Sequence, residues 1–458
     1  SAAVALAGCG RQEGRRTPTD WEAPTSRPAP STASRTPSRP VDVREAIEEW
    51  GFDRGVEIDP RGDGAVDAAL RDAAGDGTLV YLPPGRHHLT EPLSLTSFER
   101  FGLIGRDATL VPPDGYEGTV LRLGKPGDAS ELLVDGIDFD FEAESPGGRP
   151  IVARVDDRLV IRDVAVNGRQ DVESDLVRID VADEDGSALV ERLDLLDGGV
   201  AGDWEGDSGI TGCEVGSDNR GDVTFRDCHI EGFPDNGLYA DPPTGAVRVE
   251  GGYYANNGVA NVRVNGGAGS VVRGVYVRCD EAREGVENMR GIRLRGGDAP
   301  LVESCVVELD TVTDSDGGIT VHSQLSAATI RNCYLRVDAD DVPAVRVKTP
   351  ASGIDGDGPV EIRNLHVEGD ADGEAAIDVA DRGDCSIARA CIRQTGRDRD
   401  GIRTEGVGGW IRDALISVRG RALAFEDSNV ETANVTVDDS PESLSTERQK
   451  RCRQRVER

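Results

Sequence analysis

A repeat of about 24 to 30 residues is the feature of this sequence that most constrains its fold. In each unit, a strand of alternating apolar residues ends in Arg followed by Asn or Asp, and a partner strand reads Gly or Ala followed by apolar-x-apolar. Thr329–Cys333 is an example of the first strand and Gly318–His322 of the second. A fixed period with such short strands indicates a solenoid, and β-branched alternation without intervening helices favours a parallel β-helix. We therefore predict an all-β fold of about 11 or 12 coils over residues 79–440.

Two columns of equivalent positions follow from stacking these units. One column holds an Asn or Asp in a corner of the coil, where its side chain can satisfy backbone groups of the turn; it comprises Asp163, Asp227, Asn332, Asn364 and Asp413. The other is an inward column of cysteines: Cys228, Cys305, Cys333 and Cys391. Coils lie about 4.8 Å apart. This spacing is compatible either with disulfides between cysteines of neighbouring coils or with a stack of buried thiols.

The segment before the repeats is expected to cap the solenoid over residues 41–78. Its patterns predict a helix over 43–50, a short Ala-rich helix over 66–74 and a strand over 78–82. The run Gly62-Asp63-Gly64, the Ala-rich helix, the strand and turn Leu79-Val80-Tyr81-Leu82-Pro83-Pro84-Gly85, and the strand Leu93-Ser94-Leu95 resemble the opening of right-handed parallel β-helices of the pectate-lyase superfamily. The resemblance implies a right-handed coil whose N-terminal end is covered by the helix.

The two ends of the chain are expected to lie outside the fold. Residues 1–9 read as the last part of an export signal with a lipobox that ends in Cys9, which would carry the lipid. Residues 10–40 are rich in Thr, Ser and Pro, as in an extended tether, and residues 441–458 form a basic tail. We expect an extracellular protein held to the outer face of the cell membrane only by this lipid; a chance Ala/Leu run with a free Cys9 thiol is the alternative.

The charge balance limits the partners of this chain. It has 85 acidic and 52 basic side chains, for a formal net charge of −33. A field of this sign repels polyanions, which argues against general binding to nucleic acid or anionic membranes. Only three of the basic residues are lysines, a balance typical of proteins from salt-adapted organisms. We expect a monomer.

A basic stripe stands out against this acidic background. Because strands stack in register, outward residues of the Gly-apolar strands form ladders along one face. The first outward position reads Arg178, Tyr239, Arg263, Arg293, Thr320, Arg346, Asp378 and Arg403. The second reads Asp180, Asp241, Asn265, Arg295, His322, Lys348 and Glu405. The candidate ligand-binding residues are Arg263, Arg293, Arg295, Arg403, Tyr239 and Trp204, the last from an acidic loop.

This stripe suggests a groove for an acidic polysaccharide such as a polyuronate. Guanidinium groups bind carboxylates, and Ca²⁺ is the candidate cofactor, with loop carboxylates as its ligands. These candidate metal ligands are Asp203, Asp207, Asp314 and Asp316. Cleavage by β-elimination needs a base beside a neutralised uronate carboxylate, and the candidate catalytic residues are Lys348, Arg346 and His322. The opposing interpretation is that the arginines pair with acids and only hold neighbouring coils together.

Two further functions are compatible with the same face. The segment Val345-Arg346-Val347-Lys348-Thr349, followed by Gly358-Pro359-Val360, is similar to the Arg-x-Lys segment of polygalacturonase-type glycoside hydrolases. That family also uses three aspartates and a Gly-His-Gly, whereas this chain reads Gly317-Gly318 before His322. Asp235 and Asp241 would be the acids available for such hydrolysis. The other alternative is a surface scaffold or adhesin that binds its ligand without cleaving it.

Overall fold

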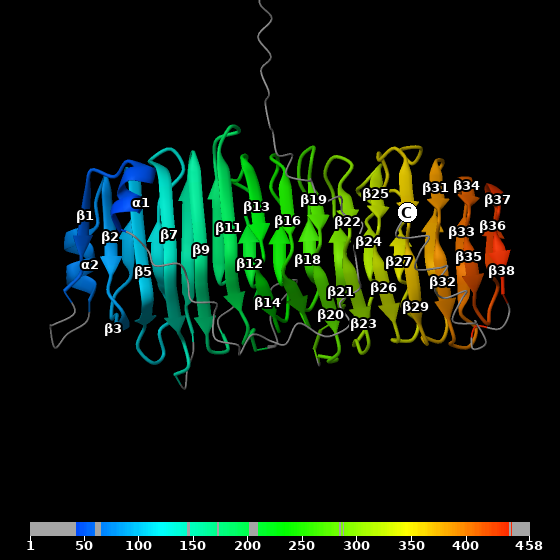
Figure 1. Cartoon of the computed structure of the whole chain (residues 1–458), viewed down its shortest axis with the longest axis horizontal. Helices are drawn as coiled ribbons and strands as arrows, with labels where there is room; N and C mark the ends of the chain where they lie inside the picture. The colour runs from blue at the N-terminus through cyan, green and yellow to red at the C-terminus, as the bar shows by residue number, and fades with distance from the viewer. Residues whose placement is uncertain are drawn as a thin grey trace, which may run out of the picture.

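The protein is a right-handed parallel β-helix (Figure 1). The structure is a computed structural model that describes residues 43–59, 66–143, 147–171, 174–200, 209–283, 285–286, 288–438 and 441. All strand pairs are parallel and fall into two sheets, one of 13 strands and one of 25. The predicted all-β solenoid is confirmed, and the 13 strands show that the estimate of 11 or 12 coils was slightly low.

In most coils, one strand of the 13-stranded sheet is followed by two strands of the 25-stranded sheet. The 13-stranded sheet contains β4 (Leu93–Leu95), β6 (Thr119–Leu123), β8 (Arg149–Val155), β10 (Val177–Val181), β12 (Cys213–Val215), β15 (Leu238–Ala240), β18 (Ala260–Val264), β21 (Arg290–Leu294), β24 (Ile319–Val321), β27 (Val345–Val347), β30 (Ala375–Ala380), β33 (Asp400–Glu405) and β36 (Leu423–Glu426). The first row of the 25-stranded sheet contains β1 (Arg54–Glu57), β2 (Thr78–Leu82), β13 (Asp222–Arg226), β16 (Val247–Glu250), β19 (Val271–Arg273), β22 (Leu301–Glu303), β25 (Ala328–Arg331), β28 (Val360–Arg363), β31 (Cys385–Ala388), β34 (Gly408–Arg412) and β37 (Asn429–Ala433). Its second row contains β3 (Gly85–His88), β14 (His229–Glu231), β17 (Tyr253–Ala255), β20 (Tyr276–Cys279), β23 (Val306–Leu309), β26 (Tyr334–Val337), β29 (His366–Gly369), β32 (Cys391–Gln394), β35 (Leu415–Ser417) and β38 (Thr436–Val437). Four long strands span both rows: β5 (Phe98–Val111), β7 (Ala129–Asp140), β9 (Arg158–Asn167) and β11 (Ser187–Leu195).

A left-handed corner separates the two rows of the larger sheet. The backbone φ angle is positive at all five predicted corner positions, with values between 51° and 57°: Asp163, Asp227, Asn332, Asn364 and Asp413. Asn and Asp tolerate this conformation better than other residues with a Cβ atom. The amide of Asn364 also donates a hydrogen bond of 2.7 Å to the side-chain oxygen of Asn332 on the neighbouring coil. The predicted Asn/Asp corner is therefore confirmed.

The corner gives a first testable prediction. Asn364→Ala places a Cβ-bearing residue without a compensating side chain at a φ of 52°, so we expect the free energy of unfolding to fall by about 1 to 2 kcal/mol. Asn364→Gly tolerates the same backbone and loses only the side-chain bonds with Asn332 and Arg389, so it should cost less. Urea denaturation measures both variants; equal losses would contradict the role of the backbone conformation.

Inward side chains fill the solenoid and include part of the cysteine column. Cys228, Cys305 and Cys333 are fully buried free thiols, so the thiol-stack alternative applies to them. Cys391 does not belong to this column, because it pairs in register with His366 rather than with the residue before it. The residue equivalent to Cys333 in that coil is Ala390. The prediction was wrong by one residue because the chain makes its corner at Arg389, whose φ is 53°.

Two short helices precede the regular coils. Helix α1 (Val43–Trp50) and helix α2 (Asp67–Ala73) match the predicted helices. Leu70 and Ala73 of α2 join the main hydrophobic core at the N-terminal end of the solenoid, whereas Trp50 of α1 packs in a separate cluster on the outside of the strands. Strand β1 already pairs with β2, so the sheet begins within the segment expected to form the cap. In the described part of the chain, no helix has the length and apolar character needed to cross a membrane.

Candidate functional site

The outer face of the 13-stranded sheet carries the predicted ladder. Cα partners in successive strands give the first row: Arg178, Glu214, Tyr239, Arg263, Arg293, Thr320, Arg346, Asp378 and Arg403. Every residue predicted for this row is present in the predicted order. Glu214, on β12, is an additional member that we had not predicted, although its segment Gly212-Cys213-Glu214-Val215 fits the repeat. Trp204 lies outside the described residues.

The C-terminal part of this row is an ion-pair network. Arg346 contacts Glu374 and Asp378, each at 3.3 Å. Arg403 on the next arginine-bearing strand also binds Asp378, at 2.9 Å, and Glu374. This part of the stripe therefore fits the interpretation that arginine ladders hold coils together. The charges of Arg346 and Arg403 are neutralised within the protein.

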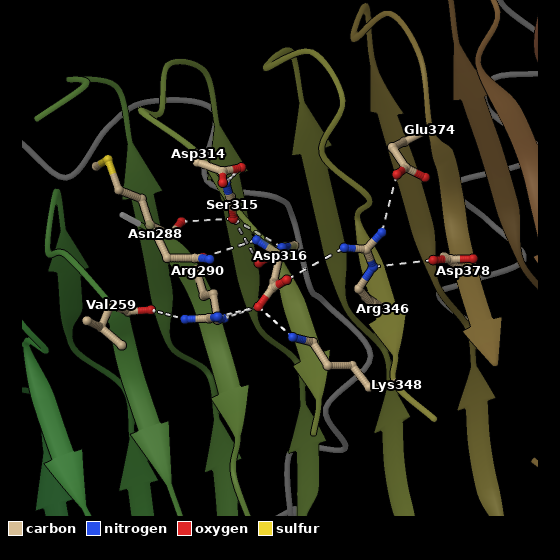
Figure 2. Close-up of polar contacts among 12 residues, drawn as sticks. Val259, Asn288, Arg290, Asp314, Ser315, Asp316, Arg346, Lys348, Glu374 and Asp378 are labelled. Atoms are coloured by element: carbon tan, nitrogen blue, oxygen red, sulfur yellow. Dashed lines mark hydrogen bonds and ion pairs between the residues drawn. The ribbon is translucent and has the colours of Figure 1, made fainter. Parts of the chain in front are cut away.

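Asp316 is the centre of a second network (Figure 2). Its carboxylate accepts hydrogen bonds from Arg290 Nε at 2.8 Å and from Lys348 Nζ at 2.7 Å, and Arg346 Nη1 lies 3.6 Å away. Burial raises the pKa of Asp316, but the bonds from Lys348 and Arg290 outweigh burial and lower it to about 2. Asp316 is therefore an ionised carboxylate surrounded by three positively charged side chains. Arg290, at the start of β21, is a residue that sequence reasoning missed.

These contacts bear on the roles proposed for Lys348 and Asp316. A lysine whose ammonium group donates to an ionised carboxylate has no free lone pair with which to take a proton from a substrate. Three neighbouring cations also oppose Ca²⁺ binding at Asp316. Asp314 turns back to accept from the backbone N–H of Ser315, at 2.7 Å. Among the described residues, no group of three or more His, Cys, Asp or Glu side chains could hold a metal ion; the other two candidate ligands, Asp203 and Asp207, lie outside them.

The middle of the face contains cations without a carboxylate partner. We define the cationic patch as Arg293, Arg295, Thr320 and His322, from β21 and β24 and the residues that follow them. Within the described structure, Arg293 makes no hydrogen bond or ion pair, and its Nε atom and the Thr320 hydroxyl are buried without a partner. Burial and the neighbouring Arg290, Arg263 and Arg295 lower the pKa of Arg293 to about 10. The patch thus holds positive charge that the rest of the protein does not neutralise.

His322 is a neutral member of this patch. Its Nδ1 atom lies 3.1 Å from Arg295 Nη1. Because a guanidinium group only donates, Nδ1 is the acceptor and Nε2 carries the hydrogen. Burial, followed by the charges of Arg295, Arg293 and Lys348, lowers the pKa of His322 to about 3. At neutral pH the ring therefore offers an N–H donor and is a very weak base.

Beside the patch, Tyr239 and Arg263 form a stacked pair. The guanidinium carbon of Arg263 lies 3.9 Å from the centre of the Tyr239 ring, within the range of a cation–π interaction. Asp241 accepts from Arg263 at 3.1 Å, from the Tyr239 hydroxyl at 3.2 Å, and from Asn265. This aspartate is therefore fully engaged with the residues around it.

Asp235, the other acid considered for hydrolysis, lies before β15. Its carboxylate accepts from the Thr211 hydroxyl at 3.0 Å and from Asn236 at 2.7 Å. Burial raises its pKa, although Arg263 and Arg293 act in the opposite direction. Arg263 thus acts on both acids, through its charge on Asp235 and through a hydrogen bond to Asp241.

No protein-family model matches the sequence, and no curated protein matches it either. The fold is similar to that of PfbA, a surface adhesin of Streptococcus pneumoniae, at 12% identity over 86% of this chain and 92% of that chain, with a TM-score of 0.44. It is also similar to the A-module of the mannuronan C-5 epimerase AlgE6 of Azotobacter vinelandii, at 15% identity over 86% and 98% of the chains, with a TM-score of 0.41. A third similar structure is the catalytic unit of a GH87 α-1,3-glucanase from Streptomyces thermodiastaticus, at 13% identity over 84% and 69%, with a TM-score of 0.39. What this chain shares with these proteins is the parallel β-helix fold.

Proposed function

We propose that this protein binds an acidic polysaccharide, such as a polyuronate, across the cationic patch. The observation that carries the proposal is the absence of any carboxylate partner for Arg293 and Arg295 in the described structure. In a chain with a net charge of −33, an unpaired and partly desolvated guanidinium costs stability. An external carboxylate would remove that cost, because a guanidinium fork binds a carboxylate through two parallel hydrogen bonds.

The remaining groups of the patch suit a sugar. The Nε2–H of His322 and the hydroxyl of Thr320 can bond to sugar oxygens, and the half-buried ring of Tyr239 adds an aromatic surface next to Arg263. Neighbouring coils lie about 4.8 Å apart, roughly the length of one sugar unit. A polysaccharide that runs along the solenoid axis would therefore place one sugar unit over each successive coil.

Binding is better supported than cleavage. β-Elimination by Lys348, Arg346 and His322 remains a candidate activity, but Lys348 and Arg346 both contact Asp316, and His322 is a weak base. Hydrolysis by Asp235 and Asp241 is supported only by the raised pKa of Asp235. Binding without cleavage, as by a surface scaffold or adhesin, requires no catalytic group in addition to the residues described above.

We further propose an extracellular location for this activity. The Thr/Ser/Pro-rich segment 10–40 and the lipobox ending in Cys9 support export and lipid anchoring. Both segments lie outside the described residues, and mass spectrometry of the membrane fraction for acylated Cys9 would test the anchor. A polysaccharide on the cell surface or in the surrounding medium would then be the accessible ligand.

The proposal is tested by titrating the chain with polygalacturonate, alginate and neutral dextran in moderate salt. We expect calorimetric binding to the two uronate polymers and none to dextran, weakening as salt is raised because the contact is ionic. Absorbance at 235 nm and reducing ends, followed in the same samples, should stay constant. Equal affinity for dextran, or no binding to any polymer, would contradict the proposal; a rise at 235 nm would show that the site is a lyase.

A further inference from the structure

A carboxyl-rich cluster lies on β10 and β12, in the same sheet as the cationic patch and separated from it by β15 and β18. It comprises seven charged side chains in two ion-paired groups: Asp218, Arg154, Asp180, Arg178 and Glu214 form one chain of ion pairs, and Arg149 and Asp175 form a separate pair. Asp180 is fully buried and Asp175 is 8% exposed. Glu214 belongs to the first row, where its Cα partner on the next strand is Tyr239. The cluster is therefore continuous with the proposed binding face.

The cluster has one carboxyl group more than it has cations. Three guanidinium groups face four carboxyl groups within the described structure. Arg154 and Arg178 both bind Asp180, at 3.0 and 3.2 Å, and Arg149 binds Asp175. Glu214 is left with one ion pair, to Arg178 at 3.4 Å. With all four acids ionised, this partly buried cluster would carry an uncompensated negative charge, which is unfavourable in a low dielectric.

Two buried carboxylate oxygens in the cluster, Asp175 Oδ2 and Asp180 Oδ1, also lack a donor among the described residues. Asp175 Oδ2 receives no hydrogen bond from a described residue, and the nearby Asp175 carboxyl group raises the pKa of Glu214. Two ionised carboxylates cannot bond to each other, but a carboxylic acid and a carboxylate can, through one short O–H···O bond. A single proton between Asp175 and Glu214 would give Asp175 Oδ2 a partner and cancel the excess charge.

We propose that Asp175 and Glu214 hold one shared proton and so form a proton-binding site beside Tyr239, on the same face as the cationic patch. Burial, followed by the charge of Asp175, raises the pKa of Glu214 to about 7, with Arg178 opposing and Asp180 reinforcing the shift. The groups that face Glu214 are Asp175, which precedes β10, Arg178 and Asp180 from β10, and Tyr239 from β15. The two acids titrate as a pair, so the proton belongs to both.

This proton site would control ligand affinity, an effect that rests on the proposed function. Below about pH 7 the pair carries one negative charge, and above it two. The second charge repels an anionic polymer that extends from Arg263 over Tyr239. At about 10 Å and an intermediate dielectric, one unit charge changes affinity about 3- to 5-fold. We therefore expect tighter binding at pH 6 than at pH 8.

The proton itself can be tested without any ligand. Infrared difference spectra between pH 6 and pH 8 should show the carbonyl band of a protonated carboxylic acid in the wild-type protein, and Glu214→Gln should lose this band. Asp218→Asn is the matched control, because Asp218 binds Arg154 in the same cluster but is half exposed, and it should keep the band. Absence of a Glu214-dependent band would overturn the proposal whether or not a polysaccharide binds.

The linkage to binding forms the second arm of the experiment. Affinity for polygalacturonate should fall 3- to 5-fold from pH 6 to pH 8 in the wild type, and Glu214→Gln should remove most of this fall, because glutamine mimics the protonated acid. A Glu214-dependent band without polygalacturonate binding would support the proton site and count against the proposed function. Unchanged pH dependence in Glu214→Gln would overturn the linkage.

Discussion

Replacing Asp316 with asparagine is expected to lower the free energy of unfolding by about 2 to 3 kcal/mol. The carboxylate is 18% exposed and lies among Arg290, Arg346 and Lys348. Asparagine keeps the size of the side chain but removes the charge that holds these three cations together. The expected loss is below that of a fully buried pair, because the side chains remain partly in contact with water.

The same carboxylate makes stability depend on acid pH. The pKa of Asp316 is lowered from 3.8 in the unfolded chain to about 2 in the folded protein. A lowered pKa stabilises the fold above the unfolded value, and this stabilisation disappears as the pH falls from about 4 towards 2. The contribution is about 2 kcal/mol. This pH-dependent contribution should be absent from Asp316→Asn over the same pH range.

Urea denaturation at neutral pH and across this acid range measures both effects. Asp314→Asn is the matched control, because Asp314 lies in the same loop and only accepts a backbone hydrogen bond. We expect this control to lose less than about 1 kcal/mol. If the two variants were equally stable, the ion-pair network around Asp316 would not be a stabilising feature.

The double variant Arg293→Gln/Arg295→Gln is expected to lose most of the affinity for polyuronate. A hydrogen bond to a charged group contributes about 1.5 to 3 kcal/mol, so each arginine accounts for about a 10- to 100-fold change in the dissociation constant. The free energy of unfolding of this double variant should not fall along with its affinity. Folding disfavours the charged form of Arg293, whose pKa drops to about 10, so removal of this cation should leave the free energy of unfolding equal or higher.

This combination separates a binding role from a structural role for the arginines. A ladder that only held coils together would lose stability on substitution, as we expect at Arg346, which has carboxylate partners. Arg273→Gln/Arg331→Gln is the matched control for charge: both arginines bind Glu303 on the 25-stranded sheet. It removes the same two charges from another face and should retain affinity within about twofold. Equal losses in both double variants would indicate a general effect of charge.

Much of the fold could be predicted because the sequence repeats. The period sets the coils, the alternation sets which side chains point inward, and the Asn/Asp residues mark the left-handed corner, as at Asn332 and Asn364. Cys391 was placed one residue out of register because its corner residue is Arg389, which a search for Asn or Asp does not detect. The long strands β5, β7, β9 and β11, which span both rows of the 25-stranded sheet, were not predicted from the repeat.

The candidate site was predictable as a row of residues but not as a set of charges. In-register stacking placed Arg293 beside Arg263 and Thr320. Which arginine is neutralised depends on acids that come from loops, such as Asp316, and on their side-chain conformations. Sequence reasoning named Lys348 as a candidate catalytic residue, whereas the structure gives it Asp316 as a partner and leaves Arg293 without a carboxylate partner among the described residues.

The most direct test of the central claim is the dissociation constant of the wild-type chain for polygalacturonate compared with the same polymer after full methyl esterification. Esterification leaves the sugar backbone in place and removes the carboxylate charges that Arg293 and Arg295 are proposed to bind. The account predicts at least a tenfold weaker affinity for the ester. Equal affinity for the two polymers would contradict carboxylate recognition by the cationic patch.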